Sequence, residues 1–401
     1  MTRFRCDDAD YHRWRATQIV VRGRVLDVGS RPGVPGLGEE DAAAGLLLDH
    51  IDIRAGDSVC DLHCGPGAVG AIAALAATDG RAWLLDTHLL SAEAARRTLD
   101  ANGVSNASVA FGHAADAVPA GSADVALVRI PKGRIPIIQL LWDAYHVLRP
   151  GGRCYIAGGN NEGIRPALRQ MEELFGGGAV LGYRSGHRVG MAVRPDTAAA
   201  RTGVFDSPWL DPDHFHGFQV ETRGGTYEIR TRPGVFAWDR LDRGTQSLLE
   251  AMDVRGAASI LDLGCGFGIV GAAAARLAAG ARVTMVDASF DAIRASTATV
   301  AANGLTDRCD VAASDIAAVI PDQSADLVLT NPPFHTGGAT DLTVPAQFIR
   351  DAARVLKPGG RLCLVANRTL PYEAWLQECF GSWTVSHDGR EFKVLSATRR
   401  D

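Results

Sequence analysis

The second half of the chain alternates short apolar segments with longer stretches that carry apolar residues at helical spacing. The short segments have the length of buried strands, and the stretches between them are long enough for helices. Gly304 ends one of these stretches, where a left-handed C-cap is expected. The expected strands are 259–262, 282–287, 326–330 and 361–366, and the expected helices are 270–279, 288–303 and 346–356. This alternation predicts an α/β fold with a mostly parallel, twisted sheet that is covered by helices on both faces.

The chain repeats itself once. At an offset of 201 residues, residues 61–67 (Asp-Leu-His-Cys-Gly-Pro-Gly) align with residues 262–268 (Asp-Leu-Gly-Cys-Gly-Phe-Gly). Farther along, residues 148–152 align with residues 356–360 at an offset of 208, so the second copy has gained residues between these points. A single long period indicates two copies of one domain and not a solenoid of short repeats.

The join between the copies is expected near residues 193–203. This stretch is small, polar and punctuated by Pro and Gly, as linkers are. We therefore predict two tandem domains, residues 1–195 and residues 205–401. Each copy begins with an expected β-hairpin, which in the second copy turns at Gly224-Gly225.

A glycine-rich turn follows the first expected strand of the second copy. Residues 266–271 read Gly-x-Gly-x-x-Gly, and Asp287 lies about 20 residues farther on, as in dinucleotide-binding turns. Enzymes that bind NAD and enzymes that bind S-adenosylmethionine share this pattern, and a plain strand-to-helix turn is the bland alternative. Asp262 would be awkward beside a pyrophosphate, and Asp315 follows the next strand, where an acid can meet an adenine amino group. These two acids favour S-adenosylmethionine.

Asn331-Pro332-Pro333-Phe334 follows the expected strand 326–330. An amide oxygen and a backbone carbonyl can each accept one N–H of a planar amino group, which frees the nitrogen lone pair to attack a methyl group. Prolines fix the backbone, and an aromatic ring can stack on a base. The run therefore predicts methyl transfer to an amino nitrogen, with a rigid turn as the structural alternative. For His335 we favour loop structure or RNA contact over a role as a base.

These motifs together resemble a known family. In their order along the chain they are similar to class I S-adenosylmethionine-dependent methyltransferases that act on exocyclic or amide NH2 groups. Residues 232–401 resemble more narrowly the bacterial rRNA guanine-N2 methyltransferases, which also consist of two similar domains of which only the second is active. The shared sequences are 233–236 (Pro-Gly-Val-Phe), 242–245 (Asp-Arg-Gly-Thr), 331–335 (Asn-Pro-Pro-Phe-His), 365–368 (Val-Ala-Asn-Arg) and 392–394 (Phe-Lys-Val).

The resemblance implies two tandem Rossmann-like methyltransferase domains and transfer of a methyl group to N2 of a guanine in ribosomal RNA. The sequences at 370–372 and 301–304 resemble the small-subunit enzymes slightly more, which favours 16S over 23S rRNA as the substrate. The implied catalytic residues are Asn331, Pro332, Pro333 and Phe334. The implied cofactor-binding residues are Asp262, Gly264, Gly266, Gly268, Asp287, Ala288, Asp315, Asn331 and Thr245.

Other activities remain open at this point. N6-adenine and protein-glutamine methyltransferases also use Asn-Pro-Pro-aromatic runs, although Phe334 and the duplication favour guanine. A non-catalytic RNA-binding or assembly protein is the alternative of another class, and the intact second-copy motif argues against it. A small-molecule methyltransferase is the last alternative, because the modest net charge of −5 does not indicate a nucleic-acid binder.

The first copy lacks the acceptor motif. Where the second copy has Asn331 and its neighbours, the first reads Arg129-Ile-Pro131-Lys132, and His63 replaces Gly264 in the glycine turn. We expect this copy to be non-catalytic and to place RNA or stabilise the other copy. Lys132 and Arg134 are candidates for phosphate contact, with a plain surface loop as the alternative.

Cysteine usage and the N-terminal residues bear on location and partners. The eight cysteines show no zinc-ligand spacing, so we expect reduced thiols and no metal. The start, Met-Thr-Arg-Phe-Arg-Cys-Asp-Asp, has no apolar signal region, and no apolar run reaches the length of a membrane span. We therefore expect a cytoplasmic protein. The resemblance implies ribosomal RNA or a ribosomal subunit as its partner, and we expect a monomer.

Overall fold

The computed structural model of the chain describes residues 4–8, 10–21, 23–34, 42–131, 133–333, 342–368 and 370–400. The chain forms two compact units. The first unit is Trp14–His214, and the second combines Phe215–Asp401 with the N-terminal segment Met1–Arg13. Their limits differ from the predicted ranges 1–195 and 205–401. Tyr11 joins a hydrophobic core of the second unit, whereas Phe205 joins a core of the first.

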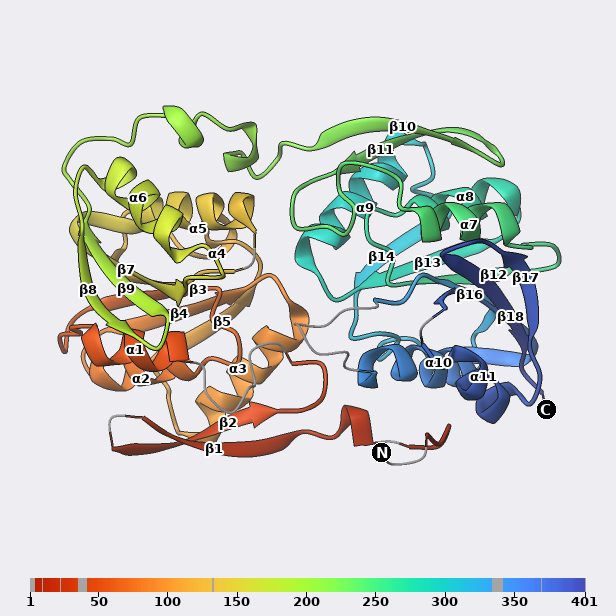
Figure 1. Cartoon of the computed structure of the whole chain (residues 1–401), viewed down its shortest axis with the longest axis horizontal. Helices are drawn as coiled ribbons and strands as arrows, with labels where there is room; N and C mark the ends of the chain where they lie inside the picture. Colours follow the sequence, from red (N-terminus) through yellow and green to blue (C-terminus); the bar gives the residue numbers. More distant parts are fainter. Residues whose placement is uncertain are drawn as a thin grey trace. The chain divides into compact units, whose positions relative to one another are not determined.

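Each unit contains one seven-stranded sheet, and the two sheets have the same strand order (Figure 1). In the first unit the order is β5-β4-β3-β6-β7-β9-β8, and in the second it is β14-β13-β12-β15-β16-β18-β17. The first five strands of each order run parallel, and the last two pair antiparallel with their neighbours. The α/β class and the duplication are both confirmed.

The elements of the first unit follow the repeat from hairpin to edge strands. They are β1 (Arg15–Val21), β2 (Arg24–Ser30), α1 (Ala42–His50), β3 (Ser58–Leu62), α2 (Ala68–Ala76), β4 (Arg81–Asp86), α3 (Leu89–Ala101), β5 (Ala107–Phe111), α4 (Ala114–Ala117), β6 (Ala123–Arg129), α5 (Arg134–Val147), β7 (Leu148–Gly159), α6 (Ile164–Phe175), β8 (Ala179–Arg184) and β9 (His187–Val193), followed by the 3-10 helices η2 (Gly203–Phe205) and η3 (Pro208–Leu210).

The second unit repeats this succession of strands and helices without a counterpart of α4, and its N-terminal segment contributes the 3-10 helix η1 (Asp10–His12). Its other elements are β10 (His216–Thr222), β11 (Gly225–Thr231), α7 (Arg243–Ala251), β12 (Ser259–Leu263), α8 (Ile269–Leu277), β13 (Arg282–Asp287), α9 (Phe290–Ala302), β14 (Cys309–Ala313), β15 (Ala325–Thr330), α10 (Thr343–Val355), β16 (Leu356–Asn367), α11 (Tyr372–Phe380), β17 (Thr384–Asp388) and β18 (Phe392–Thr398).

The strands and helices expected in the second copy are present with ends shifted by up to three residues, except that β16 begins five residues before the expected strand 361–366. β15 explains why the apolar signal is strong: Leu327 and Leu329 pack into one core of the unit, and Val328 packs into another. A parallel strand buried on both faces reads as a continuous apolar run. Gly304, with φ +66°, follows the last residues of α9 in the left-handed conformation expected there.

Both hairpins lie outside the large sheets, and an equivalent asparagine in each unit holds the hairpin in place. In the second unit Asn303 donates to the carbonyl of Glu228 at 2.7 Å, and its Oδ1 accepts from the Glu228 N–H at 3.1 Å. Asn102 makes the same two bonds with Asp27 in the first unit, at 2.7 and 3.1 Å. The Asn-Gly pair that recurs in the sequence therefore docks each hairpin on its helix.

The second unit places helices on both faces of its sheet. α7, α8 and α9 pack side by side on one face, and α10 and α11 cover the other (Figure 1). The chain runs from β12 outward to β13 and β14, then returns to β15 on the other side of β12. Such a switch in strand order opens a crevice at the carboxyl ends of the two central strands, which is where open α/β sheets bind ligands.

One disulfide corrects the expectation of eight reduced thiols. Cys6 of the N-terminal segment is bonded to Cys379 of α11, with a Cα–Cα distance of 5.1 Å. The other six cysteines are free and buried. The two bonded residues are 373 positions apart in the sequence, so no local spacing indicated the pair.

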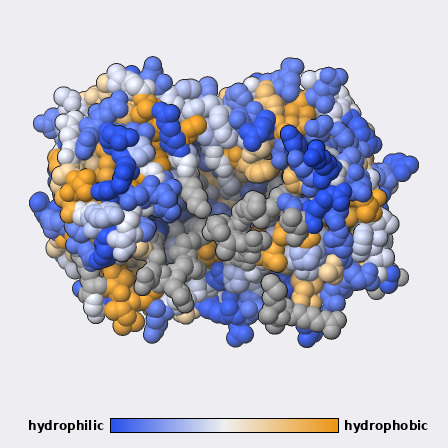
Figure 2. Space-filling model, viewed as in Figure 1, coloured by the Kyte–Doolittle hydropathy of each residue, from blue (hydrophilic) through white to orange (hydrophobic). Residues whose placement is uncertain are grey.

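The visible surface is mainly hydrophilic with separate smaller hydrophobic patches (Figure 2). Large apolar side chains that are exposed include Val20, Tyr183 and Phe236, at 72%, 59% and 64%. None of the helices in the described part of the chain combines the length and hydropathy that a bilayer span requires.

Candidate active site

The glycine turn leaves β12 and enters α8 at the carboxyl edge of the second unit's sheet. Gly264, Gly266 and Gly268 have φ values of +76°, +55° and +85°, a conformation that favours glycine. The Gly264 N–H donates to the carbonyl of Val286 at 2.9 Å, which ties the turn to β13. A Cβ added at Gly266 would meet no heavy atom within 4 Å. The turn therefore presents bare backbone to open space at Gly266.

Two carboxylates hold this turn from different sides. Asp287 ends β13, and its Oδ2 accepts from the Gly266 N–H at 3.0 Å while its Oδ1 accepts from the Ser289 N–H at 2.9 Å. Asp262 is 2% exposed, and its Oδ2 accepts from the Gly271 N–H at 2.8 Å. Burial raises the pKa of Asp262 to about 7. Asp287 is only half-buried at the edge, whereas Asp262 supports the first turn of α8 from below.

Asp315 lies at the same edge, directly after β14. The Ser314 N–H before it donates to the carbonyl of Asp287 at 2.9 Å. Asp315 is 4% exposed, and both of its oxygens face the N-terminal segment. Tyr11 donates its hydroxyl to Oδ1 at 3.1 Å, and His12 Nδ1 lies 3.6 Å from Oδ2.

Asn331 follows β15 with its side-chain amide in a fixed orientation. Nδ2 donates to Thr245 Oγ1 at 2.9 Å and to Asp242 Oδ2 at 3.2 Å. Because a carboxylate only accepts hydrogen bonds, the NH2 group must face Asp242 and the amide oxygen must face away. That oxygen is buried, and no donor of the described residues reaches it. An unpaired buried acceptor is uncommon in folded proteins and suits a donor brought by a ligand.

The two residues that orient Asn331 come from the start of α7. Asp242 is the N-cap of this helix, and its Oδ2 accepts from the Thr245 N–H at 3.0 Å. Thr245 was predicted to bind cofactor, and this stays a prediction; the structure places its hydroxyl against Asn331. Asp242 was not among the predicted site residues. Its N-cap signal was visible in the sequence, but its link to Asn331, 89 residues away, was not.

The remaining predicted residues are only partly described. Pro332 is buried, Pro333 is exposed, and Ala288 lies half-buried beside Asp287. The predictions for Phe334 and His335 fall outside the described residues.

The first unit keeps the backbone arrangement of this site, but a side chain fills the space over its glycine turn. Asp86 accepts from the Gly65 N–H at 2.9 Å, just as Asp287 accepts from Gly266. A Cβ added at Gly65 would lie 2.5 Å from Arg129 Nη2, where the second unit is open. Arg129 also bonds to the carbonyl of His63 at 3.3 Å, and His63 holds φ +66° without being glycine. The Arg129 guanidinium thus occupies the space over the turn.

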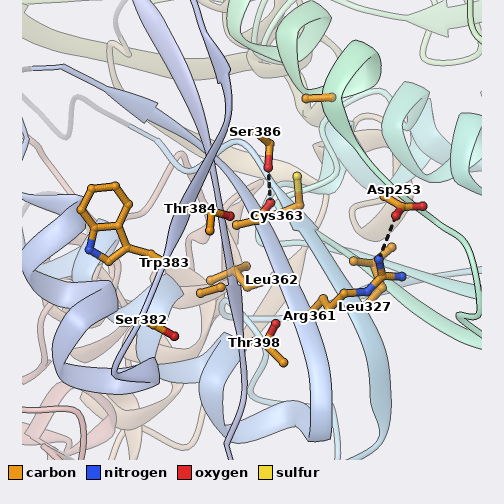
Figure 3. A pocket seen from close by; sticks show the side chains of 13 residues that line it. Asp253, Leu327, Arg361, Leu362, Cys363, Ser382, Trp383, Thr384, Ser386 and Thr398 are labelled. Carbon is orange, nitrogen blue, oxygen red and sulfur yellow. Dashed lines mark hydrogen bonds and ion pairs between the residues drawn. The ribbon is translucent and has the colours of Figure 1, made fainter.

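A cavity of about 310 Å³ lies elsewhere in the second unit (Figure 3). It is lined by Leu327 of β15, by residues 361–363 in the middle of β16 and by residues of β17 and β18, with the Arg361–Asp253 ion pair, N–O 3.2 Å, at its border. Leu327 pairs with Ile260 near the amino end of β12, whereas the glycine turn follows the carboxyl end of that strand. The cavity is therefore separate from the candidate active site.

A metal centre finds no support in the described ranges. Across those residues, no group of three or more His, Cys, Asp or Glu side chains is placed to hold a metal ion.

Comparison with known proteins decides the family. The model of the methyltransferase small domain matches residues 25–190 and 226–396, which is most of both units. The chain belongs to the methyltransferase small-domain family. Within this family it is similar to proteins named ribosomal RNA small subunit methyltransferase C. The Klebsiella pneumoniae relative is 34% identical over 287 residues, covering 72% of this chain and 79% of the relative.

Two further family members extend the comparison. The Hahella chejuensis relative of the same name is 43% identical over 175 residues, and this match spans 43% of the chain and half of that relative. A solved structure of the T. thermophilus 16S rRNA N2 G1207 methyltransferase (RsmC), in complex with AdoMet and guanosine, matches with a TM-score of 0.81. It is 29% identical and covers 98% of this chain and 99% of its own. The likeness therefore includes both tandem domains.

Proposed function

We propose that this chain transfers a methyl group from S-adenosylmethionine to the exocyclic N2 amine of a guanine in small-subunit ribosomal RNA. The observation that carries the proposal is the Asn331 amide. Its NH2 group is held by Asp242 and Thr245, and its buried oxygen has no donor among the described residues. The names of the relatives and the ligands of the T. thermophilus structure support the same chemistry.

The acceptor chemistry follows from where the hydrogen-bond acceptors lie. The lone pair of an exocyclic amine is delocalised into the base, so the nitrogen is a weak nucleophile. Asn331 Oδ1 accepts one N–H and the Pro332 carbonyl accepts the other, which draws the nitrogen toward a tetrahedral shape. Pre-positioned acceptors of this kind need no reorganisation during the reaction. The nitrogen loses its surplus proton to water after transfer, so the site needs no strong base.

The cofactor edge of the second unit fits S-adenosylmethionine. This compound supplies a methyl group on a positively charged sulfur. Gly266 gives its backbone room to approach, and Asp287, fixed by two N–H donors, offers its half-buried carboxylate to ribose hydroxyls. Asp315 serves the adenine amino group. Asp262 supports the glycine turn from beneath, because its buried carboxylate accepts a hydrogen bond from the Gly271 N–H.

The target base has to leave its stack to reach this edge. Enzymes that act on a base atom take up single-stranded nucleotides or flip the base out of a duplex. We assign Phe334 to stacking on the extruded guanine, as aromatic side chains do in RNA recognition. Action on ribosomal RNA would place the protein in the cytoplasm, where we expect it to act as a monomer.

The first unit has a supporting role in this proposal. Arg129 fills the turn at Gly65, and no asparagine stands in the place of Asn331. We assign this unit to RNA placement and to support of the second unit, without methyl transfer.

A purified-component assay tests the proposed function. The full chain is incubated with labelled S-adenosylmethionine and, in parallel, small ribosomal subunits, free 16S rRNA and large subunits, and the RNA is digested to nucleosides. The proposal predicts labelled N2-methylguanosine from small-subunit RNA. Labelled N6-methyladenosine, or label in protein only, would assign one of the alternative methyltransferase activities. Cofactor binding without any label transfer would indicate a non-catalytic protein.

A further inference from the structure

The N-terminal segment packs on the second unit through contacts at both of its ends. Near the start, the Phe4 ring lies 5.6 Å from the Trp375 ring, and the Arg350 guanidinium sits 4.4 Å over Phe4. Arg350 also donates to the carbonyl of Arg5 at 2.7 Å. The disulfide at Cys6 ties the segment to α11. These contacts hold the segment along α10 and α11.

The far end of the segment reaches the cofactor edge. Tyr11 lies in η1, is 3% exposed, and donates its hydroxyl to Asp315 Oδ1 at 3.1 Å. The next residue, His12, places Nδ1 3.6 Å from Asp315 Oδ2 and Nε2 3.5 Å from Asp351 Oδ1. One carboxylate is therefore engaged at both oxygens by two consecutive residues of a distant part of the chain. Such a two-point contact fixes its orientation.

Charge gives this contact its strength. Asp315 and Asp351 are 4% and 2% exposed, and two buried carboxylates side by side are costly without a counter-charge. Hydrogen bonds to Asp315 and Asp351 raise the pKa of His12 to about 9, so the ring is an imidazolium at neutral pH. Gln347 and Arg354 also face this cluster: Gln347 donates to Asp351 at 3.1 Å, and Arg354 Nε lies 3.6 Å from it.

The position of Asp315 gives the contact a function. Asp315 follows β14, beside Asp287, at the edge where the proposed function places the cofactor. We infer that Tyr11 and His12 are positioning residues of the cofactor site, which hold the Asp315 carboxylate in place to receive the adenine amino group. The first residues of the chain thereby complete a site built by the last part of the chain. This inference rests on the proposed function and adds to it a requirement for the N-terminal segment.

The test separates cofactor affinity from turnover. S-adenosylmethionine binding to the full chain is measured by calorimetry for wild type, Tyr11→Phe and His12→Gln, together with kcat at saturating cofactor. Tyr11→Phe removes only the hydroxyl and keeps the buried ring. Tyr183→Phe and His187→Gln, both in the first unit, are matched controls. We expect Tyr11→Phe and His12→Gln each to weaken binding about tenfold with kcat within about twofold of wild type, and the controls to bind normally.

A pH series adds a readout that a purely structural role would not move. Wild-type affinity falls as pH rises through about 9, because His12 loses its charge, and in His12→Gln this fall is absent. Wild-type binding of S-adenosylmethionine with unchanged affinity in both variants would overturn the inference and leave the proposed function standing. A loss of kcat without a loss of affinity would overturn it as well. Failure of wild type itself to bind the cofactor would overturn the proposed function, and this inference with it.

Discussion

The amide nitrogen of Asn331 lies 2.9 Å from the hydroxyl oxygen of Thr245. Together with Asp242, 3.2 Å away, this contact decides which end of the amide faces the protein. The oxygen end is left buried and without a donor among the described residues. The side chain that we propose as the acceptor for the substrate amine is thereby oriented by Asp242 and Thr245.

Removing the Thr245 hydroxyl should reduce turnover. Thr245→Val keeps the shape of the side chain but deletes the acceptor that orients the Asn331 amide. Loss of one such bond, worth about 1 kcal/mol, predicts a kcat lower by about five- to tenfold with cofactor affinity unchanged. Thr245→Ser retains the hydroxyl and should stay close to wild type. Weaker cofactor binding with normal kcat in Thr245→Val would instead assign Thr245 to the cofactor.

The paired glycines offer a comparison within one chain. Gly266 and Gly65 both have φ +55°, so replacement of either by alanine strains the backbone by about 1–2 kcal/mol. Only at Gly266 does the new methyl group enter open space at the candidate cofactor edge; at Gly65 it meets Arg129. We expect Gly266→Ala to weaken S-adenosylmethionine binding by roughly tenfold or more, and Gly65→Ala to leave it unchanged. Equal losses of cofactor affinity in both variants would contradict this division between the units.

The buried carboxylate of Asp262 makes stability depend on pH. Burial raises its pKa from 3.8 to about 7, so the folded state binds a proton that the unfolded state has released. Its effect on stability is favourable below about pH 4 and is lost as pH rises through 7. Asp262→Asn removes this dependence and should exceed wild type in unfolding free energy at pH 8 by on the order of a few kcal/mol. Unfolding curves between pH 4 and 8, with the exposed Asp100→Asn as control, measure the difference; parallel wild-type and Asp262→Asn curves would contradict it.

The Cys6–Cys379 disulfide can be tested by counting the cysteines that react with an alkylating reagent. Alkylation of the denatured chain should modify six cysteines without reductant and all eight after reduction. Cys6→Ser should lower the unfolding free energy by about 2–4 kcal/mol, because the bond closes a loop that spans most of the chain. Mass spectrometry gives the count. Eight modified cysteines without reductant would show that the pair is reduced.

Local features of the sequence predicted the parts of the fold that local forces control. The apolar run of β15 follows from burial on both faces, and the end of α9 follows from Gly304. The duplication predicted two copies of one domain, and the strand order that both units share agrees with it. The glycine turn and Asn331 were brought to one edge because both follow central strands of a parallel sheet.

Contacts between distant residues were beyond the sequence pattern. Asp242 meets Asn331 across 89 residues, and Tyr11 meets Asp315 across 304. Neither pair has a spacing rule that would reveal it. In the sequence, Arg129 showed only that the first copy lacks the acceptor motif. The structure shows that its guanidinium fills the space over the turn at Gly65. In each case the sequence indicated the chemical role of one residue but not the residue that it contacts.

The most direct test of the central claim is nucleoside mass spectrometry of ribosomal RNA from a strain that lacks this protein. The strain is complemented with wild type, with Asn331→Ala, or with Asn161→Ala as an exposed control in the first unit. We predict that one N2-methylguanosine disappears from small-subunit RNA in the deletion strain and returns with wild type and Asn161→Ala but not with Asn331→Ala. Unchanged N2-methylguanosine in the deletion strain, or full restoration by Asn331→Ala, would contradict the account.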